Sequence, residues 1–109
     1  MSTIEVRRYI TDLGKDVVGE WMDNLKDLRA RARILARIAR LAVGNFGDCN
    51  PLRAGVLELR IDYGPGYRIY FARLSQSVVL LLCGGDKRRQ DLDIERAVKF
   101  WKDYEKRTQ

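Results

Sequence analysis

Residues 55–89 alternate apolar and polar side chains in a pattern that predicts three consecutive strands. The first two predicted strands, residues 56–62 and 67–73, alternate with a period of two, which is typical of half-buried antiparallel strands. The third, residues 78–83, is apolar throughout, which is expected of a strand covered on both faces. Tyr63-Gly64-Pro65-Gly66 and Ser75-Gln76-Ser77 supply the turn residues between them. The pattern therefore predicts an antiparallel meander.

Two stretches before the meander repeat their apolar side chains at helical spacing. In residues 13–24 the repeat predicts a helix that Thr11 or Asp12 caps. Residues 27–43 predict a longer helix that begins at Asp27, whose carboxylate suits the positive end of a helix. Only a residue or two separates the helices, so we expect an antiparallel helical hairpin. The expected apolar stripe of the second helix is Leu28, Ile34, Leu35, Ile38, Leu41 and Ala42.

The remaining segments complete an α+β fold. Residues 3–10 predict a short strand at or next to the sheet edge, residues 44–54 a loop, and residues 91–107 a last helix. The expected order is β-α-α-β-β-β-α in one domain over residues 1–109, with the helices on one face of the sheet. The other face is expected to be open and to carry Glu58, Arg60, Arg68 and Tyr70.

Composition indicates a folded, soluble chain, because 46% of the residues are apolar and 33% are charged. The longest apolar run, residues 78–83, is far shorter than the roughly 20 residues that span a bilayer. Residues 1–20 lack the features of a signal peptide, so we expect a cytoplasmic protein with no membrane partner. Cys49 and Cys83 are expected to stay free. Without histidine or a CxxC motif, neither a zinc site nor a cofactor is expected.

The positive charge is concentrated in the middle of the chain. Residues 28–89 hold 12 basic and 4 acidic side chains, and 15 of the 21 cations of the whole chain are arginine. Arginine forms forked contacts with phosphate, so a polyanion such as nucleic acid is an expected partner. Four arginines share one face of the second helix: Arg29, Arg33, Arg37 and Arg40. That face is either solvated or in contact with an acidic protein or nucleic acid.

The chemistry open to the chain is limited by the residue types present. Without histidine, a Ser/His/Asp or Cys/His arrangement is impossible, and no phosphate-binding glycine motif is present. Gly64-Pro65-Gly66 and Gly84-Gly85 are interpreted as turns. The remaining candidates are the strand and turn residues Glu58, Arg60, Tyr63, Tyr67, Arg68, Tyr70, Lys87, Arg88 and Arg89. Arginines stabilise the charge of a phosphorane, and tyrosines stack on unpaired bases. Because RNA supplies its own 2′-hydroxyl nucleophile, these residues are compatible with cleavage of single-stranded RNA.

Three segments resemble the RelE/ParE toxin superfamily, in particular its phage Gp49-like, HigB-type branch of addiction-module killer proteins. They are GVLELRIDYGPGYRIYF (55–71), VVLLLCGGDKRRQDLDIERA (78–97) and KFWKDY (99–104). The resemblance implies a type II toxin that is neutralised by a cognate antitoxin, expected to be a helix-turn-helix protein. RelE-like members cleave messenger RNA in the ribosomal A site, whereas ParE-like members inhibit DNA gyrase.

The resemblance also assigns roles to residues. The catalytic arginine of the GYR strand matches Arg68, and the arginine after the last strand matches Arg88, with Lys87 beside it. Two family lysines fall near Val56 and Glu58 and are absent, as are a C-terminal tyrosine, near Ile94, and the HigB-type histidines. Glu58 or a tyrosine such as Tyr63 is then the candidate base, and Lys87 the proton donor.

Three functions follow from these observations. The first is a metal-independent, ribosome-dependent mRNA endoribonuclease with Arg68, Arg88, Lys87 and Glu58 as catalytic residues. Its RNA-binding residues would be Arg60, Tyr63, Tyr67, Tyr70 and Arg89. The second is a ParE-like gyrase inhibitor without catalytic activity, and the third is an inactive toxin that binds only its antitoxin.

Overall fold

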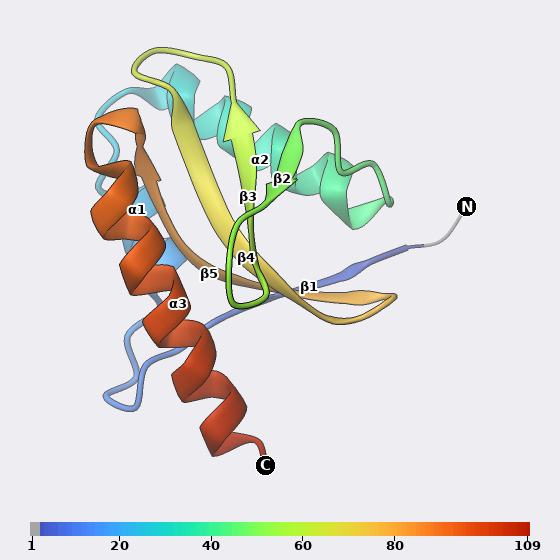
Figure 1. The fold of residues 1–109 in the computed structure, drawn as a ribbon. Helices are drawn as coiled ribbons and strands as arrows, with labels where there is room; N and C mark the ends of the chain where they lie inside the picture. The colour runs from blue at the N-terminus through green and yellow to red at the C-terminus, as the bar shows by residue number, and fades with distance from the viewer. Residues whose placement is uncertain (1–2) are drawn as a thin grey trace.

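The computed structural model describes residues 3–109 and has a five-stranded sheet between two helical layers (Figure 1). The strands are β1 (Glu5–Arg8), β2 (Cys49–Pro51), β3 (Val56–Ile61), β4 (Tyr67–Ser75) and β5 (Val78–Asp86). The helices are α1 (Val17–Asp23), α2 (Leu28–Ala42) and α3 (Gln90–Arg107), and a 3-10 turn, η1 (Lys87–Arg89), precedes α3. The α+β fold class is confirmed. Within residues 3–109, no helix is long and apolar enough to cross a membrane.

The strand order in the sheet is β1-β5-β4-β3-β2. Strands β3, β4 and β5 form the predicted antiparallel meander, and β1 lies at one edge, parallel to β5. The other edge is β2, which lies in the segment expected to be a loop, and Cys49 pairs with Leu59 there. The register of β3 and β4 places Glu58 opposite Tyr70 and Arg60 opposite Arg68. It thereby brings together candidate residues from two strands.

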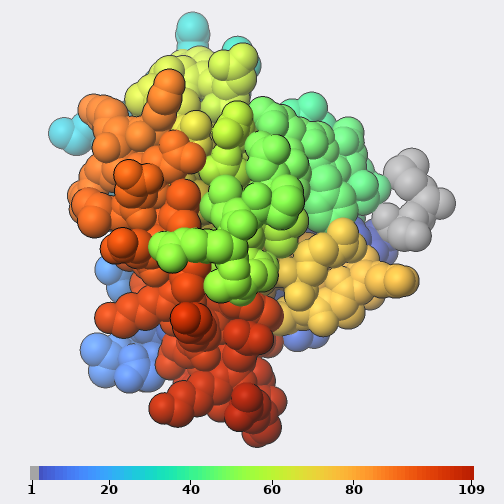
Figure 2. Space-filling model, viewed as in Figure 1, coloured from blue at the N-terminus to red at the C-terminus, as the bar shows by residue number. Residues whose placement is uncertain are grey.

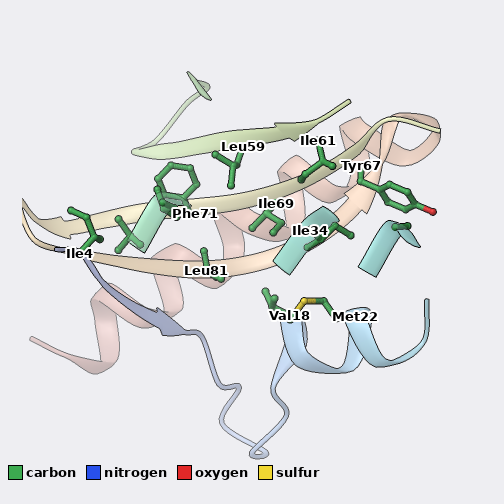
Figure 3. Close-up of a cluster of buried hydrophobic side chains, with 13 residues drawn as sticks. Ile4, Val18, Met22, Ile34, Leu59, Ile61, Tyr67, Ile69, Phe71 and Leu81 are labelled. Atoms are coloured by element: carbon green, nitrogen blue, oxygen red, sulfur yellow. The ribbon is translucent and has the colours of Figure 1, made fainter. Parts of the chain in front are cut away.

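Helices cover both faces of the sheet, so the expected open cationic face is wrong. Helices α1 and α2 pack on the face of Leu59, Ile69 and Phe71, as the close-up of this cluster shows (Figure 3). Helix α3 packs on the opposite face, where its Ala97 contacts the cluster that contains Tyr70. In the space-filling view, α3 and the chain that leads from β2 to β3 lie over much of that face (Figure 2). The physical reason is that β4 and β5 are apolar on both sides, so each face needs a cover.

Helix α1 begins later than the periodicity predicts. Its cap is Asp16, whose Oδ1 accepts a hydrogen bond from the Gly19 amide at 3.1 Å, so the prediction of Thr11 or Asp12 is wrong. Residues 11–14 form a turn instead, with the left-handed Gly14 (φ 84°) at its end. A left-handed glycine stops a helix from extending through this segment.

Helix α2 has its predicted cap and part of its predicted apolar stripe, since Ile34 and Leu41 are buried and Ile38 packs against the core. Asp27 accepts from the amides of Arg29 and Ala30 at 3.0 and 3.2 Å, which confirms the cap. Leu28 and Leu35, however, are 71% and 48% exposed. The buried positions are Ala30, Ile34, Arg37 and Leu41. The face of α2 that meets the sheet thus contains Arg37, whereas Leu35, which was expected there, faces outwards.

Strand β5 continues through Gly84 and Gly85, so the predicted turn there is wrong. A Cβ atom on Gly84 would overlap the ring of Trp21 in α1, and one on Gly85 would overlap the Asp93 carboxylate in α3. The two glycines therefore let a helix approach each face of β5 closely, which a larger residue prevents.

We expect Gly84→Ala to lower the free energy of unfolding by about 1–3 kcal/mol, because the added methyl group has no space beside Trp21. Urea unfolding followed by circular dichroism would measure the loss. In the double variant Gly84→Ala/Trp21→Leu, the combined cost should be smaller than the sum of the single costs, because the smaller side chain removes the overlap. Wild-type stability of Gly84→Ala would show that the helix does not lie against this glycine.

Candidate active site

The carboxylate of Glu58 is the centre of the candidate site. Its side chain is only 1% exposed, because β3 places it under the start of α3. Oε1 accepts a hydrogen bond from Arg60 Nε at 2.6 Å, and Oε2 accepts one from Gln90 Nε2 at 3.3 Å. Arg68 Nε lies 3.7 Å from Oε2. Strand β3 and helix α3 thus each contribute a hydrogen-bond donor to one carboxylate, and β4 contributes the charge of Arg68, whose buried Nε has no hydrogen-bond partner within residues 3–109.

Arg68 is held in place by the turn that precedes it. Its side chain is buried, and Nη1 donates to the carbonyl oxygen of Gly66 at 2.8 Å. Gly66 has a φ of 81°, and a Cβ there would lie 3.3 Å from Arg68 Nη1 and 3.6 Å from Cβ of Lys87. The glycine therefore meets two needs: it forms the turn, and it leaves room for Arg68 and Lys87 on either side.

Arg60 forms the solvent side of the cluster. Its side chain is 45% exposed, whereas its partner Glu58 is buried. The hydrogen bond to that carboxylate raises the pKa of Arg60, so the guanidinium stays charged. A hollow of about 240 Å³ opens beside it, lined by residues that include Arg60, Arg68, Gly66 and Asp62. A small anionic group that enters this hollow would meet both arginines.

Tyr70 lies next to the cluster but is completely buried. Its hydroxyl has no hydrogen-bond partner within residues 3–109. Burial raises its pKa, and the charges of Glu58 and Asp93 raise it further. The expectation that Tyr70 stacks on RNA bases from an open face is therefore wrong, since α3 covers the ring.

Tyr63 and Tyr67 lie on the other side of the sheet, with α1 and α2. Tyr67 is buried and its ring meets the edge of Trp21 at 6.3 Å between centroids. The guanidinium of Arg33 lies over the half-buried ring of Tyr63, at 4.7 Å from its centroid. Neither ring is on the face of Glu58, so the structure separates Tyr63 from the cluster, whereas Tyr67 still lines the hollow beside Arg60 and Arg68.

The cations of η1 are exposed and face solvent. Asp86 caps η1, accepting from the Arg88 amide at 2.9 Å and from Arg88 Nη2 at 2.8 Å. These contacts lower the pKa of Asp86. The Arg88 side chain is 77% exposed and is paired with Asp86, so the structure does not bring it to Glu58. Lys87 adjoins Gly66, while Arg89 lies at the exposed start of α3.

Two residues of this arrangement were not among the sequence candidates. Gln90 binds Glu58 from 32 residues away, and Asp86 orients Arg88. Asp86 carries a recognisable signal, since an aspartate two residues before an arginine at a strand end is a suitable cap. Gln90 has no such signal in the sequence, because its contact with Glu58 depends on where α3 begins relative to β3.

The cluster combines one carboxylate with two guanidinium groups. In general a carboxylate can act as a proton acceptor and guanidinium groups can bind phosphate. Within residues 3–109, no group of three or more His, Cys, Asp or Glu side chains is placed to hold a metal ion.

Comparison with known proteins gives three findings. The model of the family described as phage derived protein Gp49-like (DUF891) matches residues 20–102. An uncharacterised protein of Haemophilus influenzae is 47% identical over 95 residues, which cover 87% of this chain and 90% of the relative. The toxin–antitoxin complex RelBE2 of Mycobacterium tuberculosis contains a chain with 20% identity and a TM-score of 0.49, over 80% of this chain and 94% of that one.

We expect Glu58→Gln to lower the free energy of unfolding by roughly 1–3 kcal/mol, because it leaves the buried Arg68 without a counter-charge. Chemical unfolding at neutral pH would measure this. The double variant Glu58→Gln/Arg68→Met should lose less than the sum of the two single changes. As a control, Glu95→Gln removes an exposed carboxylate of α3 and should stay within about 0.5 kcal/mol of wild type. Equal losses for both glutamates would contradict a structural pairing at Glu58.

Proposed function

The chain belongs to the phage derived Gp49-like family, and from this premise we propose that it is the toxin of a type II toxin–antitoxin system that cleaves messenger RNA. The observation that carries the proposal is the Glu58 carboxylate held between Arg60 and Arg68 at the edge of a hollow. The RelE/ParE-like motifs in the sequence point to the same activity, and they match its catalytic arginine to Arg68.

The proposed reaction uses the RNA as its own nucleophile. Glu58 accepts the proton of a 2′-hydroxyl, and the 2′-oxygen forms a bond to the adjacent phosphorus. Arg60 and Arg68 stabilise the additional negative charge of the five-coordinate phosphorane. The bond from phosphorus to the 5′-oxygen then breaks, and Lys87 gives that oxygen its proton. The products are a 2′,3′-cyclic phosphate and a 5′-hydroxyl, and no metal ion takes part in the proposed step.

The arginines must exchange partners before Glu58 can act as a base. Arg60 Nε donates to Oε1 of the carboxylate, and Arg68 Nε lies 3.7 Å from Oε2. A phosphate group offers guanidinium the same kind of charge-assisted hydrogen bonds. Arg60 is nearly half exposed, so it can turn towards RNA while Gln90 still holds Oε2. RNA binding would thereby uncover the base only when a phosphate is in place.

A toxin of this kind requires a cognate antitoxin, because the free protein would arrest its own host. We propose a helix-turn-helix protein as that partner and mRNA on the ribosome as the substrate, in line with the RelE-like branch that the motifs resemble. The exposed arginines Arg33 and Arg40 of α2 suit either an acidic segment or RNA.

A ParE-like gyrase inhibitor is the second candidate, and one observation favours it. Glu58 is covered, Tyr70 is buried, and Arg88 is paired with Asp86, so several expected catalytic groups are not aimed at a substrate. A protein that acts only by binding its target needs no catalytic group directed at a substrate. The same observation would fit an inactive toxin that binds only its antitoxin.

We expect Arg60→Gln and Arg68→Lys each to reduce RNA cleavage by about 10²–10³-fold, as is typical when one donor to a transition-state oxyanion is removed. The protein would be induced alone in a bacterial host, with growth and new RNA 5′ ends mapped across the transcriptome. Arg29→Gln is the matched control, because Arg29 is an exposed arginine of α2 outside the cluster. Unfolding midpoints would confirm that each variant is folded.

The same induction separates the candidate functions. Ribosome-phased RNA ends that disappear in Arg60→Gln and Arg68→Lys support the nuclease. Double-strand DNA breaks without new RNA ends would select gyrase inhibition. If the host keeps growing although the induced wild-type protein is folded, antitoxin binding would be the one remaining candidate function.

Arg88 needs its own test, since it is matched to a catalytic arginine yet is bound to Asp86. If it swings onto the phosphorane, Arg88→Ala should reduce cleavage by about 10²-fold or more, while stability changes little because the side chain is largely exposed. Cleavage assays on purified protein would measure this. Cleavage by Arg88→Ala at the wild-type rate would remove Arg88 from the proposed mechanism.

A further inference from the structure

A second hollow, of about 400 Å³, lies between α2 and the end of β3. Its charged lining consists of four arginines and two aspartates: Arg33, Arg37, Arg40, Arg60, Asp48 and Asp62. Within residues 3–109, no ion pair joins either aspartate to any of these arginines. The hollow is therefore positive, and three of its four arginines have no carboxylate partner among the described residues.

Arg37 is the unusual member of this lining, because it is buried and only partly satisfied. It is 6% exposed. Its Nε donates to the carbonyl of Arg60 at 3.3 Å, and Nη2 donates to the carbonyls of Phe46 and Asp48 at 3.0 and 3.3 Å. Nη1 has no partner within residues 3–109. Burial lowers the pKa of Arg37, and the charge of Arg40 lowers it further. A buried charged donor with no acceptor is costly, and an anion in the hollow would supply that acceptor.

Gly47 leaves the space in which this guanidinium lies. Its φ is 58°, and a Cβ there would be 2.9 Å from Nη1 of Arg37. A side chain at this position would push the guanidinium aside. The loop after α2 is therefore shaped around the unpartnered nitrogen.

The hollow is continuous with the candidate active site. Arg60, Ile61, Asp62 and Asp48 line both hollows. A ligand that reaches from one hollow to the other must carry negative charge at both ends. A single-stranded RNA has one phosphate per nucleotide, so a strand whose cleaved phosphate meets Arg68 brings neighbouring phosphates towards α2.

We propose that this second hollow binds a phosphate group of the RNA strand, next to the one that is cleaved. The inference rests on the proposed function, whose substrate it positions. Arg37 and Arg40 hold the phosphate, and Arg33 is kept at the mouth by its contact with the ring of Tyr63 at 4.7 Å. The four arginines offer forked donors, which match the oxygens of a phosphodiester.

The test measures binding rather than cleavage. The probe is a short 2′-O-methyl RNA strand, which has no 2′-hydroxyl and so cannot be cut. We expect the double variant Arg33→Gln/Arg40→Gln to weaken its Kd about tenfold more than the matched control Arg29→Gln/Arg53→Gln. Both variants remove two charges from arginines outside the core, but neither control residue lines the hollow. The slope of log K against log salt should fall by about 0.7 for each phosphate that no longer binds an arginine.

Arg37 is tested separately because its removal also breaks three hydrogen bonds. Arg37→Lys keeps the charge but not the fork, and in a folded variant it should weaken binding of the same RNA by about tenfold. Should this variant fail to fold, the pair Arg33 and Arg40 still decides the outcome. Inorganic phosphate provides a further readout: it should raise the unfolding midpoint of wild type more than that of Arg33→Gln/Arg40→Gln.

The outcomes separate this proposal from the proposed function. Equal weakening by the double variant and its control would overturn the phosphate site, whatever the cleavage result. RNA binding with the expected pattern but no cleavage by wild type would support the site and reject the nuclease. If a polyglutamate peptide, and not the RNA, binds more weakly to Arg33→Gln/Arg40→Gln, the hollow binds carboxylates and the proposal is wrong.

Discussion

The buried carboxylate of Glu58 constrains three parts of the fold at once. It accepts hydrogen bonds from Arg60 on its own strand and from Gln90 at the start of α3, and its Oε2 lies 3.7 Å from Arg68 Nε of β4. A charge so deeply buried is stable only with such partners, since desolvation of a lone carboxylate costs several kcal/mol. The register of β3 and β4 and the position of α3 must therefore all be maintained for this one group to keep its partners.

Burial of the sheet on both faces decides where a ligand can bind. Helices α1 and α2 occupy one face and α3 the other, so the middle of the sheet is closed to macromolecules. What stays accessible is the end of the sheet where β3 finishes and β4 begins, next to η1. Both arginine-lined hollows lie there, beside Arg60. The functional surface is thus formed by strand ends and turns, while the strand interiors serve the core.

The sequence predicts the parts of this structure that depend on local periodicity. The meander, helix α2 with its Asp27 cap, and helix α3 follow from spacing and capping residues. The parts that depend on which layer covers a residue are not predictable in this way. Tyr70 looks like an exposed strand residue until α3 is placed over it, and Gly84-Gly85 looks like a turn until α1 and α3 are packed on β5. Among the site residues, Glu58, Arg60 and Arg68 were found from alternation and resemblance. Gln90 was not, and Arg37 was expected on the arginine face of the helix but not as a buried residue, because the partners of both come from other elements.

Arg60 lines both hollows, so a ligand in one hollow would also affect the other. Its side chain binds the Glu58 carboxylate, while its carbonyl oxygen accepts a hydrogen bond from Arg37. On one side of β3, the buried Glu58 carboxylate accepts from Arg60 and Gln90, and Arg68 Nε lies 3.7 Å away without a hydrogen-bond partner within residues 3–109. On the other side, the buried Arg37 of α2 has one nitrogen, Nη1, without a partner in the same part of the chain. In the proposed mechanism, a polyanion would take Arg60 from Glu58 and would give Arg37 an acceptor. The hydrogen bond from Arg37 would hold the backbone of Arg60 during this exchange, so that the side chain could move without disturbing the register of β3. Binding of the RNA strand would then also expose the Glu58 carboxylate. A small anion that reaches only one hollow would either release Glu58 or give Arg37 an acceptor, but not both.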